Sequence, residues 1–431
     1  MKKQLYFLLL FAVLFVVSCT PPPERIVKYT TSNNHRIENF KPKAFGEAKI
    51  VSNEYSQEDS CFCIVFDRDV TEINKGAFGG YSKLTGIEIP NGVTRIANSA
   101  FSECSGLKRV VLGCGTTTIG EYAFNSCTGL VSIKIPEGVT SIENGAFRGC
   151  EGLTTIIIPS SVTNIGAYAF ACTGLRMIEL PGSIEKIEAS TFYDCKNLIY
   201  ASIGQNVEII ANEAFCGCSE LEEVDFPNKL TSIESSAFRD CVSLAKVVIP
   251  CNVKNIGYAA FMRCSNLEEL EIGFGVQSIG NYAFSQCSNL RHVKIPDNVT
   301  TLGFDAFKGC SRLLSAYIGG GIRSVEQGIF EDCYNLQKLT ISNGVESIGH
   351  SSFKNCASLE SVIIPNSVMT IGYKAFSGCF WLSNVELGDN VKSIEGEAFY
   401  GCKNLKSIGI PYSVESVENT SFPYSTELYR K

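Results

Sequence analysis

A phenylalanine recurs at a fixed interval along most of the chain, and this spacing constrains the fold more than any other feature. Sixteen copies run from Phe78 to Phe422. The step is 23 residues throughout, except for 22 between Phe170 and Phe192. A leucine follows each phenylalanine by six residues, or by five at Leu175. A unit this short cannot bury its apolar side chains alone, so the repeat predicts neighbouring units that stack into one solenoid with a continuous core.

The units follow the consensus A-F-x-x-C-x-x-L-x-x-I-x-I-P-x-x-V-x-x-I, usually followed by glycine or glutamate. The I-x-I segment alternates at the period of a β-strand, and the proline or glycine after it keeps that strand short. The V-x-x-I segment predicts a second extended piece. At the next position Gly120 is replaced by Glu143 in the following unit, which argues against a left-handed backbone there. This exchange favours the start of a short helix, whose N-terminus an acidic residue stabilises.

The unit AFNSCTGLVSIKIPEGVTSIE, residues 123–143, resembles the BspA-like class of bacterial leucine-rich repeats. The resemblance extends over about residues 61–428. It implies an α/β repeat protein, a right-handed solenoid of about sixteen 23-residue coils with short parallel strands on one face and short helices on the other. A degenerate copy would cap its N-terminus, and a truncated repeat would end it. The resemblance also implies a secreted or cell-surface protein, and several members of the class act as adhesins for host matrix proteins or other bacteria.

The N-terminus has the features of an export signal. Two lysines precede a run from Leu5 to Val17 that is apolar except for Tyr6, and the run is too short to span a bilayer core of about 30 Å. The sequence VVSC, which ends at Cys19, resembles a bacterial lipobox, in which the cysteine receives a lipid anchor. An ordinary secretory signal that contains a cysteine is the alternative. Several acyl chains would hold the protein stably at a membrane surface.

These features predict three segments. They are a lipoprotein signal peptide at residues 1–18, the lipid-attachment cysteine with a proline-rich tether and the start of the cap at residues 19–54, and the leucine-rich-repeat solenoid at residues 55–431. The predicted location is the cell surface, through a lipid anchor in the outer membrane of a Gram-negative bacterium.

Charge and composition exclude several classes of function. The formal net charge of −7 and the lack of a basic tract argue against nucleic-acid binding. A composition of 45% hydrophobic and 19% charged residues is too apolar for a disordered chain and too polar for an integral membrane protein. The sequence shows no phosphate-binding loop, no catalytic-triad spacing and no metal motif, so we predict no enzymatic activity and no cofactor.

Most of the 20 cysteines recur at one position of the repeat. In a stack they would form a line of parallel side chains, which suits neither a disulfide nor the convergent ligands of a zinc site. We therefore expect them to fill buried slots inside the coils. Outside the line, Cys61 and Cys63 lie on one face of a strand and cannot easily bridge. The predicted line consists of Cys104, Cys127, Cys150, Cys172, Cys195, Cys218, Cys241, Cys264, Cys287, Cys310, Cys333, Cys356, Cys379 and Cys402.

The outward side chains of the strands would tile one surface, which is the natural binding face of such a solenoid. On this face an acidic group adjoins a basic one. Cross-strand ion pairs on a solvated face would explain this pattern without any ligand, whereas electrostatic steering of a protein partner is the functional alternative. The candidate ligand contacts on this face are Glu222, Glu223, Asp225, Lys246, Glu269, Glu271, His292, Lys294 and Tyr317.

A second candidate site is aromatic. Phe380 and Trp381 occupy two positions of the repeat that are usually polar, and Tyr334 lies two units earlier. Exposed tryptophan and tyrosine are enriched at interface hot spots, although partial packing against the neighbouring turn would also explain them. We expect a non-enzymatic adhesin that recognises an extracellular protein through the strand face. The alternative is a glycan- or nutrient-binding lipoprotein that works with an outer-membrane uptake system.

Overall fold

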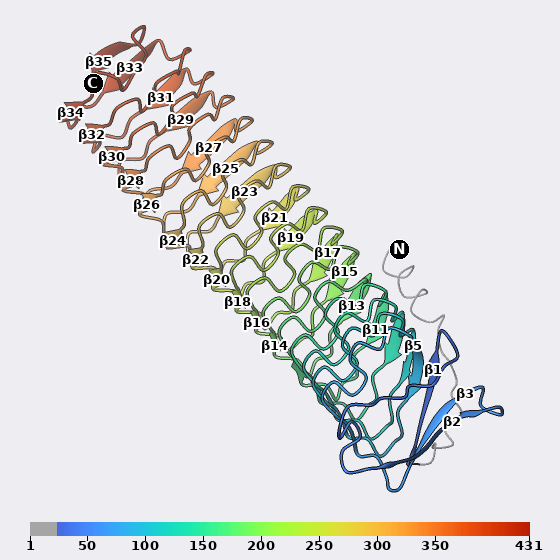
Figure 1. Ribbon diagram of the computed structural model, residues 1–431. Helices are drawn as coiled ribbons and strands as arrows, with labels where there is room; N and C mark the ends of the chain where they lie inside the picture. Colours follow the sequence, from blue (N-terminus) through green and yellow to red (C-terminus); the bar gives the residue numbers. More distant parts are fainter. Residues whose placement is uncertain (1–23) are drawn as a thin grey trace, which may run out of the picture. The chain divides into compact units, whose positions relative to one another are not determined.

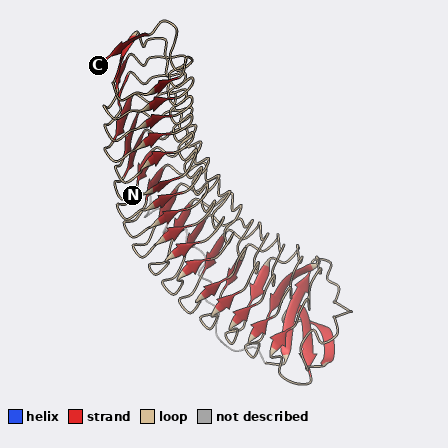
Figure 2. Cartoon of the chain, turned by 90° about the vertical axis from the view of Figure 1, so that its left-hand side faces the viewer, coloured by secondary structure: helices blue, strands red, loops and turns tan. Residues whose placement is uncertain are grey.

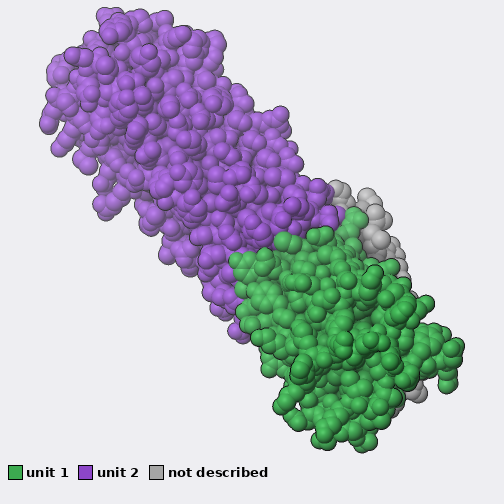
Figure 3. All heavy atoms as spheres, in the orientation of Figure 1, with its two compact units in different colours: residues 1–184 green, residues 185–431 purple. Residues whose placement is uncertain are grey.

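The computed structural model describes residues 24–431, so the predicted signal peptide and the lipid-attachment site Cys19 lie outside the described residues. Within this part of the chain, no helix is long and apolar enough to cross a membrane. The chain divides into two compact units, the first ending at Ile184 and the second running from Glu185 to Lys431 (Figure 3). In each unit, successive coils lie side by side and contribute two rows of short strands (Figure 1).

The described part of the first unit, residues 24–184, contains thirteen strands. The row from the I-x-I segments and the N-terminal cap comprises β1 (Ile26–Thr31), β2 (Ile50–Ser56), β3 (Cys61–Phe66), β5 (Leu84–Glu88), β7 (Arg109–Val111), β9 (Ser132–Lys134), β11 (Thr155–Ile157) and β13 (Met177–Glu179). The row from the V-x-x-I segments comprises β4 (Glu72–Ile73), β6 (Arg95–Ile96), β8 (Thr118–Ile119), β10 (Ser141–Ile142) and β12 (Asn164–Ile165).

The second unit repeats the same two rows. The first row comprises β15 (Tyr200–Ser202), β17 (Glu223–Asp225), β19 (Lys246–Val248), β21 (Glu269–Glu271), β23 (His292–Ile295), β25 (Ser315–Ile318), β27 (Lys338–Ile341), β29 (Ser361–Ile363), β31 (Asn384–Glu386), β33 (Ser407–Ile410) and β35 (Glu427–Arg430). The second row comprises β14 (Lys186–Ile187), β16 (Ile209–Ile210), β18 (Ser232–Ile233), β20 (Asn255–Ile256), β22 (Ser278–Ile279), β24 (Thr301–Leu302), β26 (Ser324–Val325), β28 (Ser347–Ile348), β30 (Thr370–Ile371), β32 (Ser393–Ile394) and β34 (Ser416–Val417).

The strands pair in parallel with like residues opposite each other, as the repeat predicts. In the first unit Ile133 of β9 lies opposite Ile156 of β11, and Ile119 of β8 lies opposite Ile142 of β10. Each pair is one period apart in sequence, so a side chain that is buried in one coil is covered by its equivalent in the next. The prediction of two extended pieces per unit is therefore confirmed.

The N-terminal cap is an antiparallel extension of the first strand row. Strand β1 pairs with β3 on one side and with β5 on the other, and β2 pairs with the far side of β3. Val27 and Tyr29 of β1 are buried, and the Tyr29 ring stacks on Phe62 with centroids 5.2 Å apart. Residues 26–31, which lie in the segment predicted to hold the tether and the start of the cap, therefore form part of the cap. These residues alternate buried and half-buried, and they cover the edge strand of the first coil.

The predicted short helices are absent from residues 24–431, which form only strands, loops and turns (Figure 2). The repeated phenylalanines lie in the turns. The cause is a left-handed residue two positions before and two positions after each repeated phenylalanine from Phe78 to Phe399, such as Tyr122 (φ 54°) and Ser126 (φ 57°) around Phe124. A left-handed residue every fourth position interrupts a right-handed helix. The exclusion of a left-handed backbone at the Gly120 and Glu143 positions is correct, because neither residue has a positive φ.

The turns are held together by hydrogen bonds between coils rather than along a helix. The N–H of Phe124 donates to the carbonyl of Ala146 in the next coil at 2.7 Å, and the N–H of Phe101 donates to Ala123 in the same way. Within a coil, the N–H of Cys127 closes a tight turn on the carbonyl of Phe124 at 3.2 Å. Buried backbone groups on this face therefore find partners without any helix.

The phenylalanines form continuous stacks in the core of each unit. The rings of Phe101 and Phe124 are 5.1 Å apart and inclined by 2°, and those of Phe238 and Phe261 are 5.2 Å apart and inclined by 5°. These four side chains are fully buried. The ring spacing follows from the distance between adjacent strands, which is about 4.8 Å, so the backbone repeat itself sets the stacking.

The cysteine line has the predicted filling role, and its thiols also form a hydrogen bond that the sequence did not indicate. Cys127 is fully buried and its Sγ lies 3.0 Å from the carbonyl oxygen of Phe101 in the preceding coil. Cys264 makes the same contact with Phe238 at 3.2 Å. The slot therefore selects a small side chain that can donate weakly. Burial raises the pKa of the Cys150 thiol to about 12.

The assignment of Cys172 to this line is wrong. Cys172 is only partly buried and has a left-handed backbone, with φ 55°. Thr173 takes the buried slot, and its hydroxyl donates to the carbonyl of Phe170 at 2.8 Å. This coil is one residue shorter than the others, and the deletion therefore lies after the buried cysteine position, between Thr173 and Leu175.

Candidate functional site

The strand face of the second unit brings together the charged residues that the sequence singled out. Lys246 on β19 lies directly opposite Glu269 on β21. Its ammonium is 2.8 Å from the Glu269 carboxylate and 3.8 Å from that of Glu271. The hydrogen bond raises the pKa of Lys246 and lowers that of Glu269. All three side chains are more than half exposed, so solvent screens these contacts and they stabilise the fold little.

The acidic residues on β17, and Glu222 just before it, lie one coil before Lys246. Glu222 and Glu223 are exposed, whereas Asp225 is half-buried and accepts a hydrogen bond of 2.6 Å from the hydroxyl of Tyr200 on β15. Burial, together with this hydrogen bond, raises the pKa of Tyr200 to about 12. Asp225 is therefore held in place, while Glu222 and Glu223 extend from the surface.

The basic part of the face lies on β23 and β25. The ring of His292 forms a 2.8 Å hydrogen bond between Nδ1 and the Ser315 hydroxyl. The Lys294 ammonium lies 5.7 Å from the centre of the Tyr317 ring, a distance at which a cation–π attraction operates. The Tyr317 hydroxyl donates to Asp297 at 3.2 Å. These contacts orient His292, Lys294 and Tyr317 at one surface.

Exposed apolar side chains lie at the last position of two strands of the same row. Val248 on β19 is 44% exposed and Ile363 on β29 is 63% exposed. Val248 lies opposite Glu271 and next to Lys246 along the strand. Apolar patches rimmed by charged residues are typical of protein-binding surfaces. We call the outward residues of β17, β19, β21, β23 and β25 the charged strand face.

The predicted aromatic site is only partly assembled. The rings of Phe380 and Trp381 meet edge to face with centroids 5.5 Å apart, and Trp381 is 58% exposed. The Lys403 ammonium lies 5.5 Å from the Phe380 ring centre. Tyr334 is exposed too, but within residues 24–431 its ring does not contact this pair. Phe380 and Trp381 thus form one small platform, and Tyr334 stands apart from it.

The sequence reasoning missed a second row of aromatic residues on the turn face. Tyr258 and Tyr282 meet edge to face at 5.7 Å, and Tyr282 meets Phe304 at 5.1 Å. Tyr258 is 50% exposed and Phe304 is 40% exposed. An aromatic residue stands two or three positions before the stacked phenylalanine in three successive repeats, so the pattern was visible in the sequence. We call these three residues the aromatic row.

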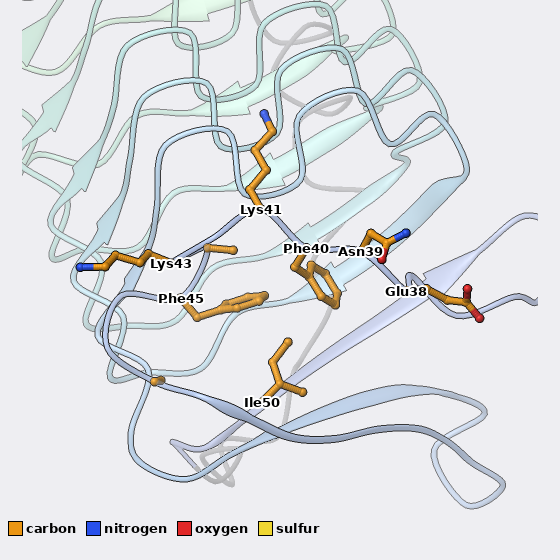
Figure 4. Close-up of a pocket in the computed structure, with 9 residues that line it drawn as sticks. Glu38, Asn39, Phe40, Lys41, Lys43, Phe45 and Ile50 are labelled. Atoms are coloured by element: carbon orange, nitrogen blue, oxygen red, sulfur yellow. The ribbon is translucent and has the colours of Figure 1, made fainter.

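One hollow occurs in the first unit, beside the N-terminal cap (Figure 4). Phe40, Phe45 and Ile50 supply its apolar surface, while Glu38, Lys41 and Lys43 stand around it. Its lining contains no histidine, cysteine or serine. Its lining therefore contains no serine–histidine or cysteine–histidine pair of the kind that activates a nucleophile.

Two rows of short parallel strands, joined by turns around stacked phenylalanine and leucine side chains, define a right-handed leucine-rich-repeat solenoid of about sixteen coils. A family model described as a BspA type leucine rich repeat region matches residues 48–171, 140–268, 185–314, 254–380 and 323–430. The chain belongs to this family. It is a family of binding scaffolds, and the match indicates no catalytic family.

The chain is also similar to proteins of solved structure. A leucine-rich repeat protein from Bacteroides ovatus is 28% identical, with 89% of this chain and 98% of that chain covered and a TM-score of 0.69. A leucine rich cell surface protein from Faecalibacterium prausnitzii is 29% identical, with 64% and 83% covered and a TM-score of 0.42. No curated protein matched the chain. The family indicates a surface protein with a protein-binding role.

Proposed function

We propose that this protein is an adhesin that binds an extracellular protein through the charged strand face. The carrying observation is the order of side chains along five successive strands of one row: acidic on β17, basic and apolar on β19, acidic on β21, and basic and aromatic on β23 and β25. The Lys246 ammonium bridges two carboxylates, and Val248 stands exposed beside it. A partner with complementary charge would replace solvent around these side chains, which gives specificity and a fast encounter.

The test is binding of the purified protein to an array of host matrix proteins and bacterial surface proteins. Charge reversal in Glu269→Lys or Glu271→Lys is expected to weaken retention at least tenfold, and raising the salt concentration is expected to do the same. Glu386→Lys is the matched control, because Glu386 has the same strand position in a later coil and is exposed. Equal loss in the control, or no loss in either variant, would refute the charged strand face as the contact.

A glycan- or nutrient-binding lipoprotein that works with an outer-membrane uptake system is the second candidate. The platform of Phe380 and Trp381 and the aromatic row favour it, because exposed rings can cover the apolar faces of sugars. The same protein on a glycan array separates the two candidates. Retention of a glycan that Trp381→Ala abolishes, and that the glutamate reversals leave unchanged, would replace the adhesin proposal.

We propose a lipid anchor at Cys19 as the attachment to the membrane, with residues 1–18 as the signal peptide. The lipobox-like VVSC sequence supports it. Metabolic labelling of cells with a radioactive fatty acid is expected to mark the protein, and Cys19→Ala is expected to remove the label and release the protein. Label that persists in Cys19→Ala would refute the anchor. Protease treatment of intact cells then tests outward display.

A further inference from the structure

Two cysteines and a carboxylate converge at the hairpin of the N-terminal cap, far from the residues of the proposed binding face in sequence. The Sγ atoms of Cys61 and Cys63 and a carboxylate oxygen of Asp59 all lie within 4.8 Å of one another. Cys61 and Cys63 point to the same side of β3, because strand side chains repeat with a period of two. Within residues 24–431, this is the one group of three or more such side chains that could hold a metal ion.

The surroundings of Asp59 direct its carboxylate toward the thiols. The Lys28 ammonium on β1 lies 2.6 Å from Oδ1, so that oxygen is occupied. The other oxygen, Oδ2, accepts a hydrogen bond from the Ser56 hydroxyl at 3.2 Å and lies 3.9 Å from the Cys63 Sγ. The N–H of Asp59 donates back to Ser56 at 3.1 Å. Outer partners that orient a ligand in this manner are typical of metal sites.

We propose that Asp59, Cys61 and Cys63 bind a thiophilic divalent cation such as Zn²⁺. Zinc takes cysteine sulfur at about 2.3 Å and carboxylate oxygen at about 2.0–2.2 Å. Tetrahedral ligands at these lengths stand roughly 3.5–3.8 Å apart, so the present group needs only a small closure. Because Asp59 and Cys63 are partly exposed, solvent can supply the fourth ligand. Each thiol gives up its proton to solvent when its sulfur binds the metal.

The charges and the other thiols of the chain agree with this assignment. The negative charges of two thiolates and the Asp59 carboxylate together equal the positive charges of the Lys28 ammonium and one divalent cation. The stacked cysteines do not compete, because Cys127 and its equivalents are buried and donate to backbone carbonyls. Cys114 and Cys251 are exposed, but neither belongs to a group of candidate ligands. One ion per chain is therefore expected.

The test uses the full chain, purified with reductant that is then removed under nitrogen. Titration with Co²⁺, read from its thiolate charge-transfer absorbance, and with Zn²⁺, read by native mass spectrometry, is expected to show one equivalent bound below micromolar concentration. Cys63→Ser and Asp59→Asn are expected to weaken binding by at least a hundredfold and tenfold, respectively. Both positions are partly exposed, so the variants should unfold at the same denaturant concentration as the parent, which urea titration checks.

Cys251→Ser is the matched control and is expected to bind as the parent does. Four results would overturn the proposal. They are the absence of a bound equivalent in the reduced parent, binding only at millimolar metal, undiminished binding in Cys63→Ser, and a Cys61–Cys63 disulfide that persists under reductant. None of these results bears on the charged strand face, which is tested by its own glutamate reversals.

Discussion

Substitution of one stacked phenylalanine tests whether the coils derive their stability from stacking on both neighbours. Phe261 is fully buried, with the ring of Phe238 at 5.2 Å on one side and that of Phe284 at 5.3 Å on the other. Replacing a buried phenylalanine by alanine costs about 3–5 kcal/mol through lost burial and the cavity that remains. With two ring contacts removed, we expect Phe261→Ala to lie in the upper half of this range.

Phe422 provides the matched control, because it ends the stack. It has one ring neighbour, Phe399 at 5.1 Å, and it is 9% exposed. A single aromatic pair contributes about 0.5–1.5 kcal/mol beyond burial, so Phe422→Ala should cost less than Phe261→Ala by at least that amount. Urea unfolding followed by circular dichroism and by tyrosine fluorescence measures both losses. Equal losses, or a loss below about 2 kcal/mol for Phe261→Ala, would refute the reasoning.

Three further predictions concern titration, reactivity and charge. Asp305 is buried, and its Oδ1 has no hydrogen-bond partner in the described part of the chain. Burial raises the pKa of its carboxyl. Asp305→Asn removes the buried charge and should raise the free energy of unfolding by about 1 kcal/mol at neutral pH. The raised pKa means that the protonated Asp305 carboxyl is less costly to the fold than the ionised one. The stability gain of Asp305→Asn should therefore vanish as the pH falls below the ordinary pKa range of aspartate, and a gain that grows in acid would contradict this prediction. A thiol reagent at neutral pH should label the exposed Cys114 and Cys251 quickly. It should label Cys104, Cys150 and Cys310 only on unfolding, because burial raises the pKa of these thiols to about 12. Equally fast labelling of all five cysteines would show that solvent reaches the cysteine line in the folded protein. Lys246→Ala should leave the urea midpoint unchanged, since its ion pairs are solvent-exposed, and a clear shift would mean that these pairs are structural.

The repeat was sufficient to predict the solenoid, its strands and its buried positions, because stacking places identical residues over each other. The turn conformation could not be predicted in the same way. Left-handed positions are usually recognised by glycine, but here Tyr122 and Ser126 occupy them, and their cost is met by hydrogen bonds to the next coil. Those bonds exist only after stacking, so no single unit reveals them.

The other errors have equally local causes. Cys172 matched the consensus by residue type, but Thr173 occupies the buried cysteine position in this shortened coil. The sequence alone does not show whether the one-residue deletion lies before or after that position. Strand β1 alternates as I-V-K-Y-T-T, a pattern hidden by the preceding prolines. On the charged strand face, the sequence predicted correctly that Lys246 lies beside Glu269 and Glu271, because the period of the repeat fixes the register of neighbouring strands. It did not identify Ser315 as the partner of His292, because side-chain rotamers decide that contact.

The hydrogen bonds between coils also bear on how the protein survives outside the reducing cytoplasm. Each coil contacts a neighbour only one period away in sequence, so native contacts close short loops and form early. Early closure sequesters the sulfur atoms before ambient oxidants can cross-link them at random. In a protein displayed at the surface, as proposed, the buried row of sulfurs would be open to oxidants only when the coils unfold.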